Sequence, residues 1–534
     1  MQIIVNTGKS QTSGFMIKKA RTRITITFFI ILCCIFTGFF FYTQLEMKEK
    51  SSKMDLYELV PYNTHSILET SNISNLFQTL ETTVYQDACT QNQISDLFNF
   101  LNYRIDELAE EKGHGLSIPM SNVLISFHAP HKSKDQVLYG HLGNGDQSLM
   151  ENILKELNTT GHSPKTIKYR GETITIYPVS NNDFLACFFL SNCYAISFQK
   201  KLIEEVIDTY KNNTSVKTDK MFSHIFIKQK NDNNIRLYAR TNPIAEWAQY
   251  DIHILDDVIY LTGACYQKKY KKNSLIPLIT EAKNPLFSAK LLPSNTTVFY
   301  QMGVQNIYSL AQRLNHNDSI KHKTTELCSE KDQSFYTFIE DYAAPEIDNV
   351  EFQGKDSTVN HRILLIPIKS DYQQTYNAWQ DLAHPVKKWI QSPKKKYQLY
   401  TIENNRVLKY LLSKRVSNKE QMKAILTKKF IIISDEEEDL QAYVSKSSYS
   451  QEAYNAWNNY IGNLAMEANF TFFSDLDEIY KRPTEFRSVL PPFFFRHLGF
   501  FRHFTVTLQL FSAETPNKLN TNIILNYKRE DINN

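Results

Sequence analysis

Glycine is scarce in this sequence. Only 15 of 534 residues are glycine, less than half the usual frequency of about 7%. Few glycines leave few loops in which the backbone can approach a phosphate closely. The G-x-S-x-G, H-E-x-x-H, P-loop and G-x-G-x-x-G motifs are all absent. This favours a protein without enzyme activity but leaves the question open, and it points to no cofactor.

Neither sign of charge dominates the chain. The 60 Lys and Arg residues nearly balance the 56 Asp and Glu residues, for a net charge of +4 at pH 7. No stretch gathers basic residues into a stripe, so the electrostatic footprint of a nucleic-acid-binding protein is missing. We therefore expect no nucleic-acid partner.

Cysteines are few and widely spaced. No C-x-x-C occurs, and an odd number of distant cysteines is typical of neither a disulfide framework nor a zinc site. Cys187 and Cys193 lie in the apolar run "FLACFFLSNCYAISF", so we expect both to be small buried residues. Whether any pair forms a disulfide stays open for the five cysteines after residue 46: Cys89, Cys187, Cys193, Cys265 and Cys328.

An uncharged apolar stretch is the strongest single signal in the sequence. Residues 24–43 are long enough to cross about 30 Å of hydrocarbon as a helix. Basic residues at positions 18, 19, 21 and 23 precede the stretch, which predicts that residues 1–23 stay in the cytoplasm and the rest crosses the membrane. The alternative is a cleaved signal peptide, but the stretch is long for one and no small-x-small cleavage site follows.

A near-repeat connects the two halves of the sequence. "LVPYNTHSIL" at 59–68 resembles "LLPSNTTVFY" at 291–300, and each leads into an extended run and then a helical pattern. Ser197 and Ser434 each end a strand-like run at the place of a helix N-cap. The two matches have nearly the same spacing along the chain.

Two further matches follow in the same order. "RLYARTNPIAEW" at 236–247 corresponds to "TFFSDLDEIYKR" at 471–482, and both are strands that run into helices. Segments that begin at Tyr250 and Phe504 alternate with the period of two that is typical of hairpin strands. The longer spacing of the last match predicts an insertion in the second copy at "TEFRSVLPPFFFRHLGF".

Together the matches predict a tandem duplication. We expect an α+β unit over residues 56–267, a connector over 268–287 and a second α+β unit over 288–528. Strands come in hairpins with helices between the groups, which favours mainly antiparallel sheets over a doubly wound parallel fold. The fold class is α+β, with a transmembrane helix before the two units.

"FTFFSDLDEIY" contains the sharpest catalytic candidate. Asp475 and Asp477 follow an apolar strand and resemble the D-x-D of metal-dependent glycosyltransferases, whose carboxylates hold a divalent cation. These two residues are the metal-site candidates. The structural alternative is that Ser474 caps the next helix and the acids stabilise its positive end.

Two segments that contain basic residues are further candidates for a functional site. "SFHAPHKSKD" carries His128 and His131 without a third metal ligand in sight, and a solvated turn is the simpler interpretation. "PPFFFRHLGFFRHF" at 491–504 alternates phenylalanines with Arg496, His497, Arg502 and His503. Its rings are expected to pack in the core or between units, with a membrane or partner surface as the alternatives.

The anchor, the "LVPYNT" opening and the "FIIISDEEEDLQAYV" segment resemble a bacterial family of membrane-anchored envelope proteins that is catalogued only as a domain of unknown function. The resemblance implies an inner-membrane protein whose bulk lies in the periplasm, and it brings no catalytic residues. We expect a non-enzymatic single-pass protein that binds an envelope partner or scaffolds a complex. The alternatives are a D-x-D glycosyltransferase and a binder of lipid or another apolar ligand.

Overall fold

The structure is a computed structural model, and it describes part of the chain. It covers residues 54–528 without these segments: 92–96, 98–121, 144–145, 157–161, 181–182, 191, 227–234, 242–245, 267–283, 286–290, 305, 309, 312–329, 355–358, 394, 413–418, 446–463, 488 and 514–517. The predicted anchor at 24–43 lies outside the described residues. Within the described part of the chain, no helix is long and apolar enough to cross a membrane.

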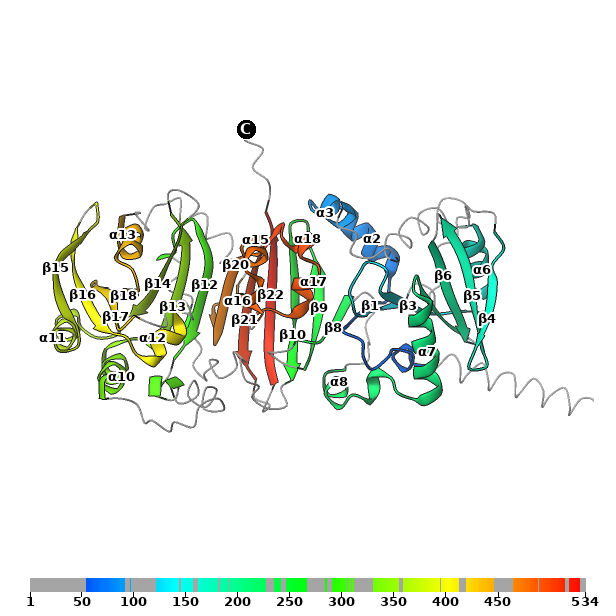
Figure 1. Cartoon of the computed structure of the whole chain (residues 1–534), viewed down its shortest axis with the longest axis horizontal. Helices are drawn as coiled ribbons and strands as arrows, with labels where there is room; N and C mark the ends of the chain where they lie inside the picture. The colour runs from blue at the N-terminus through cyan, green and yellow to red at the C-terminus, as the bar shows by residue number, and fades with distance from the viewer. Residues whose placement is uncertain are drawn as a thin grey trace, which may run out of the picture.

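A large antiparallel sheet of twenty strands dominates the fold, and helices cover it (Figure 1). The strands of its first half, in chain order, are β1 (Ser66–Thr70), β2 (Val123–Phe127), β3 (Gln136–His141), β4 (Lys165–Tyr169), β5 (Glu172–Ser180), β6 (Asp183–Leu190), β7 (Cys193–Ser197), β8 (Ile235–Ala239), β9 (Trp247–Ile254) and β10 (Val258–Tyr266).

The strands of the second half follow in chain order. They are β12 (Thr296–Gly303), β13 (Glu346–Gln353), β14 (Asn360–Pro367), β15 (His384–Gln391), β16 (Lys396–Glu403), β17 (Gln421–Leu426), β18 (Phe430–Ser434), β20 (Phe470–Asp475), β21 (Phe504–Ser512) and β22 (Lys518–Tyr527). A separate two-stranded sheet pairs β11 (Asn284–Pro285) with β19 (Glu467–Ala468).

The two halves of the large sheet have the same strand order. The first half runs β4-β5-β6-β7-β3-β2-β1-β8-β9-β10 across the sheet. The second runs β15-β16-β17-β18-β14-β13-β12-β20-β21-β22. Strands at the same place in the two halves also follow one another in the same order along the chain, so that β1 corresponds to β12 and β10 to β22.

The halves meet through their last strands. β10 and β22 pair antiparallel from Val258 opposite Asn526 to Tyr266 opposite Lys518. The sequence predicts one sheet in each unit, whereas the structure joins both into one. Both strands would otherwise be open edges, and their pairing satisfies a row of backbone donors and acceptors on each.

Helices cover both faces of the sheet. In the first half these are η1 (Leu56–Glu58), α2 (Ile73–Glu81), α3 (Gln86–Gln91), α6 (Asp146–Glu156), α7 (Lys200–Asn212), η2 (Val216–Thr218) and α8 (Lys220–Ile225). In the second they are α10 (Glu330–Tyr342), α11 (Tyr372–Leu382), α12 (Arg406–Leu411), α13 (Glu437–Ser445), α15 (Leu476–Lys481), α16 (Pro483–Phe486), α17 (Pro492–Arg496) and α18 (Leu498–Phe501).

The core has separate clusters on the two faces of each half. In the first half, α7 and α8 cover one face and α2 and α6 the other. In the second half, α13 covers one face, and α10, α11 and the helices from α15 to α18 contribute to the cluster on the other. That last cluster includes residues of β9 and β10, so it also packs the two halves together.

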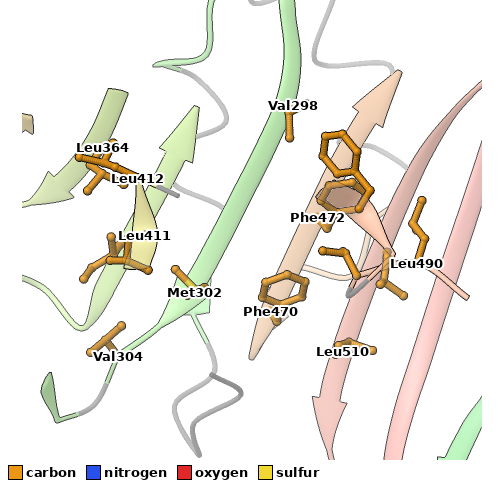
Figure 2. Close-up of a cluster of buried hydrophobic side chains, with 14 of the residues drawn as sticks. Val298, Met302, Val304, Leu364, Leu411, Leu412, Phe470, Phe472, Leu490 and Leu510 are labelled. Atoms are coloured by element: carbon orange, nitrogen blue, oxygen red, sulfur yellow. The ribbon is translucent and has the colours of Figure 1, made fainter. Parts of the chain in front are cut away.

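Buried phenylalanines at the centre of the second half illustrate this packing. Figure 2 shows Phe470 and Phe472 of β20 with Met302 of β12 on one side and Leu490 and Leu510 on the other. Leu490 belongs to residues 476–503, which link β20 to β21. This link contains the predicted insertion at 484–500, and we call the whole link the insertion. In the first half, the link from β8 to β9 occupies only residues 240–246.

Candidate functional site: a histidine and arginine cluster

Three segments far apart in sequence meet at one end of β1. The first is the lead into that strand, which carries His65. The His65 amide donates to the Phe127 carbonyl of β2 at 3.0 Å, and its own carbonyl accepts from the Arg240 amide after β8 at 2.9 Å. The backbone ladder of the sheet therefore continues one residue beyond β1 and fixes the position of His65.

The second segment is the loop from β2 to β3. The His128 amide donates to the Asp135 carbonyl, and the His131 amide donates to the His128 carbonyl, both at 2.9 Å. His131 adopts a φ of 75°, a left-handed conformation that is uncommon outside glycine but enriched for histidine. The rings of His131 and His65 stand edge to face with centroids 4.6 Å apart.

A buried polar chain lies in the same region. His128 is only 3% exposed, and its Nε2 is 2.7 Å from the Ser126 hydroxyl, which is 3.1 Å from the Tyr139 hydroxyl. Its Nδ1 is buried without a hydrogen-bond partner in the described part of the chain. The predicted solvated turn is therefore wrong for His128, because the loop folds inward and buries its ring.

The third segment is the insertion, which reaches the first half from the second. Phe493, Phe494 and Phe500 are buried in the core cluster, so the predicted packing role of this aromatic stretch is confirmed. Phe493 lies 6.4 Å from Tyr250 of β9 between ring centroids. This packing places Arg496 and His497 at the end of α17, beside the first half.

Arg496 forms the direct link between the segments. Its Nη2 donates to His65 Nδ1 at 3.4 Å. Because an arginine side chain has no acceptor, His65 Nδ1 must be unprotonated and its Nε2 carries the proton in the neutral ring. The His497 ring packs edge to face near Phe127, 6.1 Å between centroids.

Burial and neighbouring cations keep these imidazoles neutral. Burial, followed by the charges of Arg496 and Arg240, lowers the pKa of His65 from 6.5 to about 4. Burial and the nearby Arg496 lower the pKa values of His131 and His497 to about 4 as well. Burial also lowers the pKa of Arg496 itself. At neutral pH the cluster combines one guanidinium with neutral rings that can donate and accept hydrogen bonds.

The predicted metal candidates lie elsewhere, at the start of α15. Asp475 caps this helix by accepting from the Asp477 amide at 2.8 Å, and it pairs with Lys528 at 2.7 Å. Asp477 pairs with Arg502 at 3.3 Å and with Lys481 at 3.5 Å. Among the described residues, no group of three or more His, Cys, Asp and Glu side chains has the geometry of a metal site.

Ser474 does not cap α15 as the structural alternative proposed. Its hydroxyl donates to the Thr297 carbonyl of β12, and Asp475, one residue later, is the cap. Because the Ser474 hydroxyl bonds to the neighbouring strand, it does not accept from the amides at the start of α15. The stabilising role proposed for the acids at the positive end of the helix fits their positions.

A second polar group deserves comparison with a catalytic triad. Asp439 accepts from the Ser434 hydroxyl at 2.8 Å and lies 2.7 Å from His361 Nδ1. The aspartate stands between the other two residues, so no imidazole is placed to take the serine proton. Ser434 is fully buried, and its one hydroxyl proton is shared between Asp439 and the Arg362 carbonyl, each 2.8 Å away, so this group is structural.

The sequence indicated His128 and His131 in one segment and Arg496 and His497 in another, but it did not indicate that the two segments lie side by side. It missed His65, which carries no local signal because one histidine before a strand is unremarkable in composition. Cys187, Cys193 and Cys265 are free and buried, which confirms the expectation for the first two.

Comparison with known proteins gives a family match in the first half. Residues 127–257 match the family model described as "Protein of unknown function (DUF3352)". The predicted resemblance to a family catalogued only as a domain of unknown function is thereby confirmed. The DUF3352 region contains His128, His131 and Arg240, whereas Arg496 and His497 lie outside it.

Other comparisons add little to the DUF3352 match. No curated protein matches the chain. A solved structure titled "Structure of crystal form I of TP0453" is similar over 41% of this chain and 81% of its own, with 11% sequence identity and a TM-score of 0.25. That likeness is too weak to support an argument about fold or function.

Proposed function

We propose that this chain is a non-enzymatic, single-pass protein of the bacterial inner membrane whose periplasmic part scaffolds envelope proteins. Residues 24–43 would anchor it, with residues 1–23 in the cytoplasm, as the charge asymmetry around this stretch favours. The observation that carries the scaffold proposal is that the two halves share one strand order, so the sheet has two equivalent ends.

We propose further that the halves arose by tandem duplication. Local hydrogen bonds repeat between them in support. The Thr64 amide donates to the Pro61 carbonyl and the Thr296 amide to the Pro293 carbonyl, both at 3.1 Å. At the ends of β7 and β18, a serine hydroxyl donates to a carbonyl of β3 and of β14 respectively.

The end strands β4 and β15 would be the partner sites. They occupy the same place in the two strand orders and lie at opposite ends of the long axis (Figure 1). Among the described strands, β4 pairs only with β5 and β15 only with β16. Each exposes a large apolar side chain, since Ile167 is 39% and Trp389 58% exposed.

The chemistry of the end strands indicates the kind of partner. β4 carries Lys165 and Lys168, and β15 carries Lys387 and Lys388, around the exposed apolar residues. Basic edges repel one another, which prevents pairing between copies of this chain. Lys388 already pairs with Glu437 at 3.0 Å. An acidic, extended segment of another protein would satisfy the open backbone groups and the other lysines together.

Cross-linking in cells tests this proposal. The tagged full-length protein is cross-linked, solubilised and analysed by mass spectrometry for stoichiometric partners. Exposed tryptophans are frequent hot spots of interfaces, so Trp389→Ala should reduce recovery of a partner at that end by about tenfold or more. Ile167→Ala should act in the same direction at the other end.

Leu255→Ala is the matched control, because Leu255 is 53% exposed in the turn between β9 and β10, away from both end strands. This variant should recover partners as the unmodified protein does. Recovery of the protein alone, or equal loss in the control and the end-strand variants, would contradict the scaffold proposal.

A further inference from the structure

One cluster combines Arg496 with three histidines: His65, His131 and His497. In the described part of the chain, its positive charge has no counter-ion and several of its ring nitrogens have no hydrogen-bond partner. We propose that this cluster binds a phosphate group, either as free phosphate or as the phosphate monoester of a lipid head group such as that of phosphatidic acid. The site lies where the insertion of the second half meets the first half, and it is independent of the end strands.

The unpaired guanidinium of Arg496 is the first observation behind this site. Other part-buried arginines have carboxylates within 4 Å: Arg240 pairs with Asp219, and both Arg362 and Arg482 pair with Glu351. Arg496 is also part-buried, but its one polar contact is His65. Among the described residues, no carboxylate lies within ion-pair distance of it. A half-buried cation without a counter-ion is costly unless an anion binds it.

The three imidazoles supply further donors. Since His65 Nδ1 accepts from Arg496, the Nε2–H of its neutral ring is left to donate to a ligand. In the part of the chain that the structure describes, the ring nitrogens of His131 and His497 have no hydrogen-bond partner. Both side chains are half-buried rather than enclosed, so a small ion can reach them.

The arrangement suits phosphate better than a metal or a carboxylate. A cation at the centre of the cluster repels a metal ion. Donors arrive from three segments: the start of β1, the β2–β3 loop and the end of α17. The oxygens of a tetrahedral phosphate can accept from several directions at once, and a guanidinium matches two of them with its fork of N–H groups.

Binding of an anion should be coupled to proton uptake. The charges that act on these rings come from Arg496, Arg240 and the neighbouring histidines, all of them basic; the acid beside them is Asp219, which pairs with Arg240 at 3.5 Å. Burial, followed by these positive charges, lowers the pKa of each ring, so an anion that offsets the positive charge would raise these pKa values. Affinity should therefore increase as the pH falls from about 7 to about 5.5.

Calorimetry with inorganic phosphate tests the site in the full-length protein in phosphatidylcholine nanodiscs. Arg496→Gln should weaken phosphate binding by at least about tenfold, because a charged, forked donor is lost. Arg496→Lys keeps the charge but lacks the forked pair of donors, so its phosphate affinity should lie between those of the unmodified protein and Arg496→Gln. The thermal stability of Arg496→Gln without phosphate should equal or exceed that of the unmodified protein, because an unpaired charge is removed.

Arg487→Gln is the control, since Arg487 is an exposed arginine of the same insertion, and it should leave phosphate binding unchanged. Sulfate serves as a second probe because it stays dianionic through this pH range, so any gain in its affinity at low pH comes from the protein. Sulfate binding that does not change with pH would overturn the coupling between anion binding and protonation of the histidines.

Nanodiscs that contain phosphatidic acid distinguish the two sources of phosphate. Arg496-dependent stabilisation by inorganic phosphate in phosphatidylcholine nanodiscs supports a site for the free ion. Arg496-dependent stabilisation by phosphatidic acid alone supports a head-group site. If neither stabilises the protein, or if both act equally on Arg496→Gln, the phosphate site is refuted.

Discussion

At the scale of the residue, His128 is the clearest case of a side chain whose environment sets its chemistry. It is almost fully buried, with one ring nitrogen bonded to Ser126 and the basic rings of His65 and His131 nearby. Burial, followed by these two neighbours, lowers the pKa of His128 from 6.5 to about 3. The folded protein therefore holds this ring neutral under conditions in which the unfolded chain protonates it.

This difference predicts a loss of stability in acid that depends on His128. Between pH 6.5 and about pH 3 the unfolded state binds a proton that the folded state does not. The contribution of His128 to the free energy of unfolding is therefore present above pH 6.5 and falls by about 1.4 kcal/mol per pH unit below it. Urea unfolding over this range measures the slope.

His128→Gln provides the comparison, since glutamine can bond to Ser126 but does not titrate. The variant should lose less stability between neutral pH and about pH 5 than the unmodified protein. Identical pH dependence in the two proteins would show that His128 does not hold its ring neutral in the folded state.

At the scale of the element, the insertion is held to the sheet by a buried ion pair. Arg482, between α15 and α16, donates to Glu351 of β13 at 2.9 Å, and Arg362 of β14 donates to the other oxygen of the same carboxylate. The Glu351 side chain is only 5% exposed. One carboxylate thus bridges two arginines from different elements.

Glu351→Gln should destabilise the protein more than most single substitutions. It leaves two part-buried cations without their shared acid, which typically costs about 3–5 kcal/mol. Glu485→Gln is the control, because Glu485 pairs with Arg482 at 3.2 Å but is 35% exposed and should cost less than about 1 kcal/mol. Similar denaturation midpoints for the two variants would mean that the pair does not anchor the insertion.

Several elements could be predicted from local pattern. The alternation after Tyr250 and Phe504 identified the hairpins that became β9–β10 and β21–β22, because a half-buried strand imposes a period of two. The phenylalanines of the insertion were correctly expected to pack. The cap of α15 was misplaced by one residue, because the choice between Ser474 and Asp475 depends on which side chain faces the sheet.

At the scale of the whole molecule, the pairing of β10 with β22 was beyond prediction from sequence. Both strands were recognisable, but nothing local to either indicates that its free edge pairs with the other rather than with solvent or another chain. The histidine and arginine cluster depends on the same pairing, since Arg496 reaches His65 only because the halves are joined. Long-range pairing, rather than any motif, therefore assembles the candidate site.

The joining of the halves is tested most directly by a pair of cysteines across β10 and β22. Thr262 and Asn522 face each other in the register of these strands, and facing residues have the separation that a disulfide requires. Thr262→Cys with Asn522→Cys should form a disulfide under mild oxidation, detected as a linked peptide by mass spectrometry. Thr262→Cys with Asn520→Cys, displaced by two residues along β22, should not, since diagonal positions are about 7–8 Å apart. Formation of the first link alone supports a single sheet, and its absence, or equal yields of both links, would contradict it.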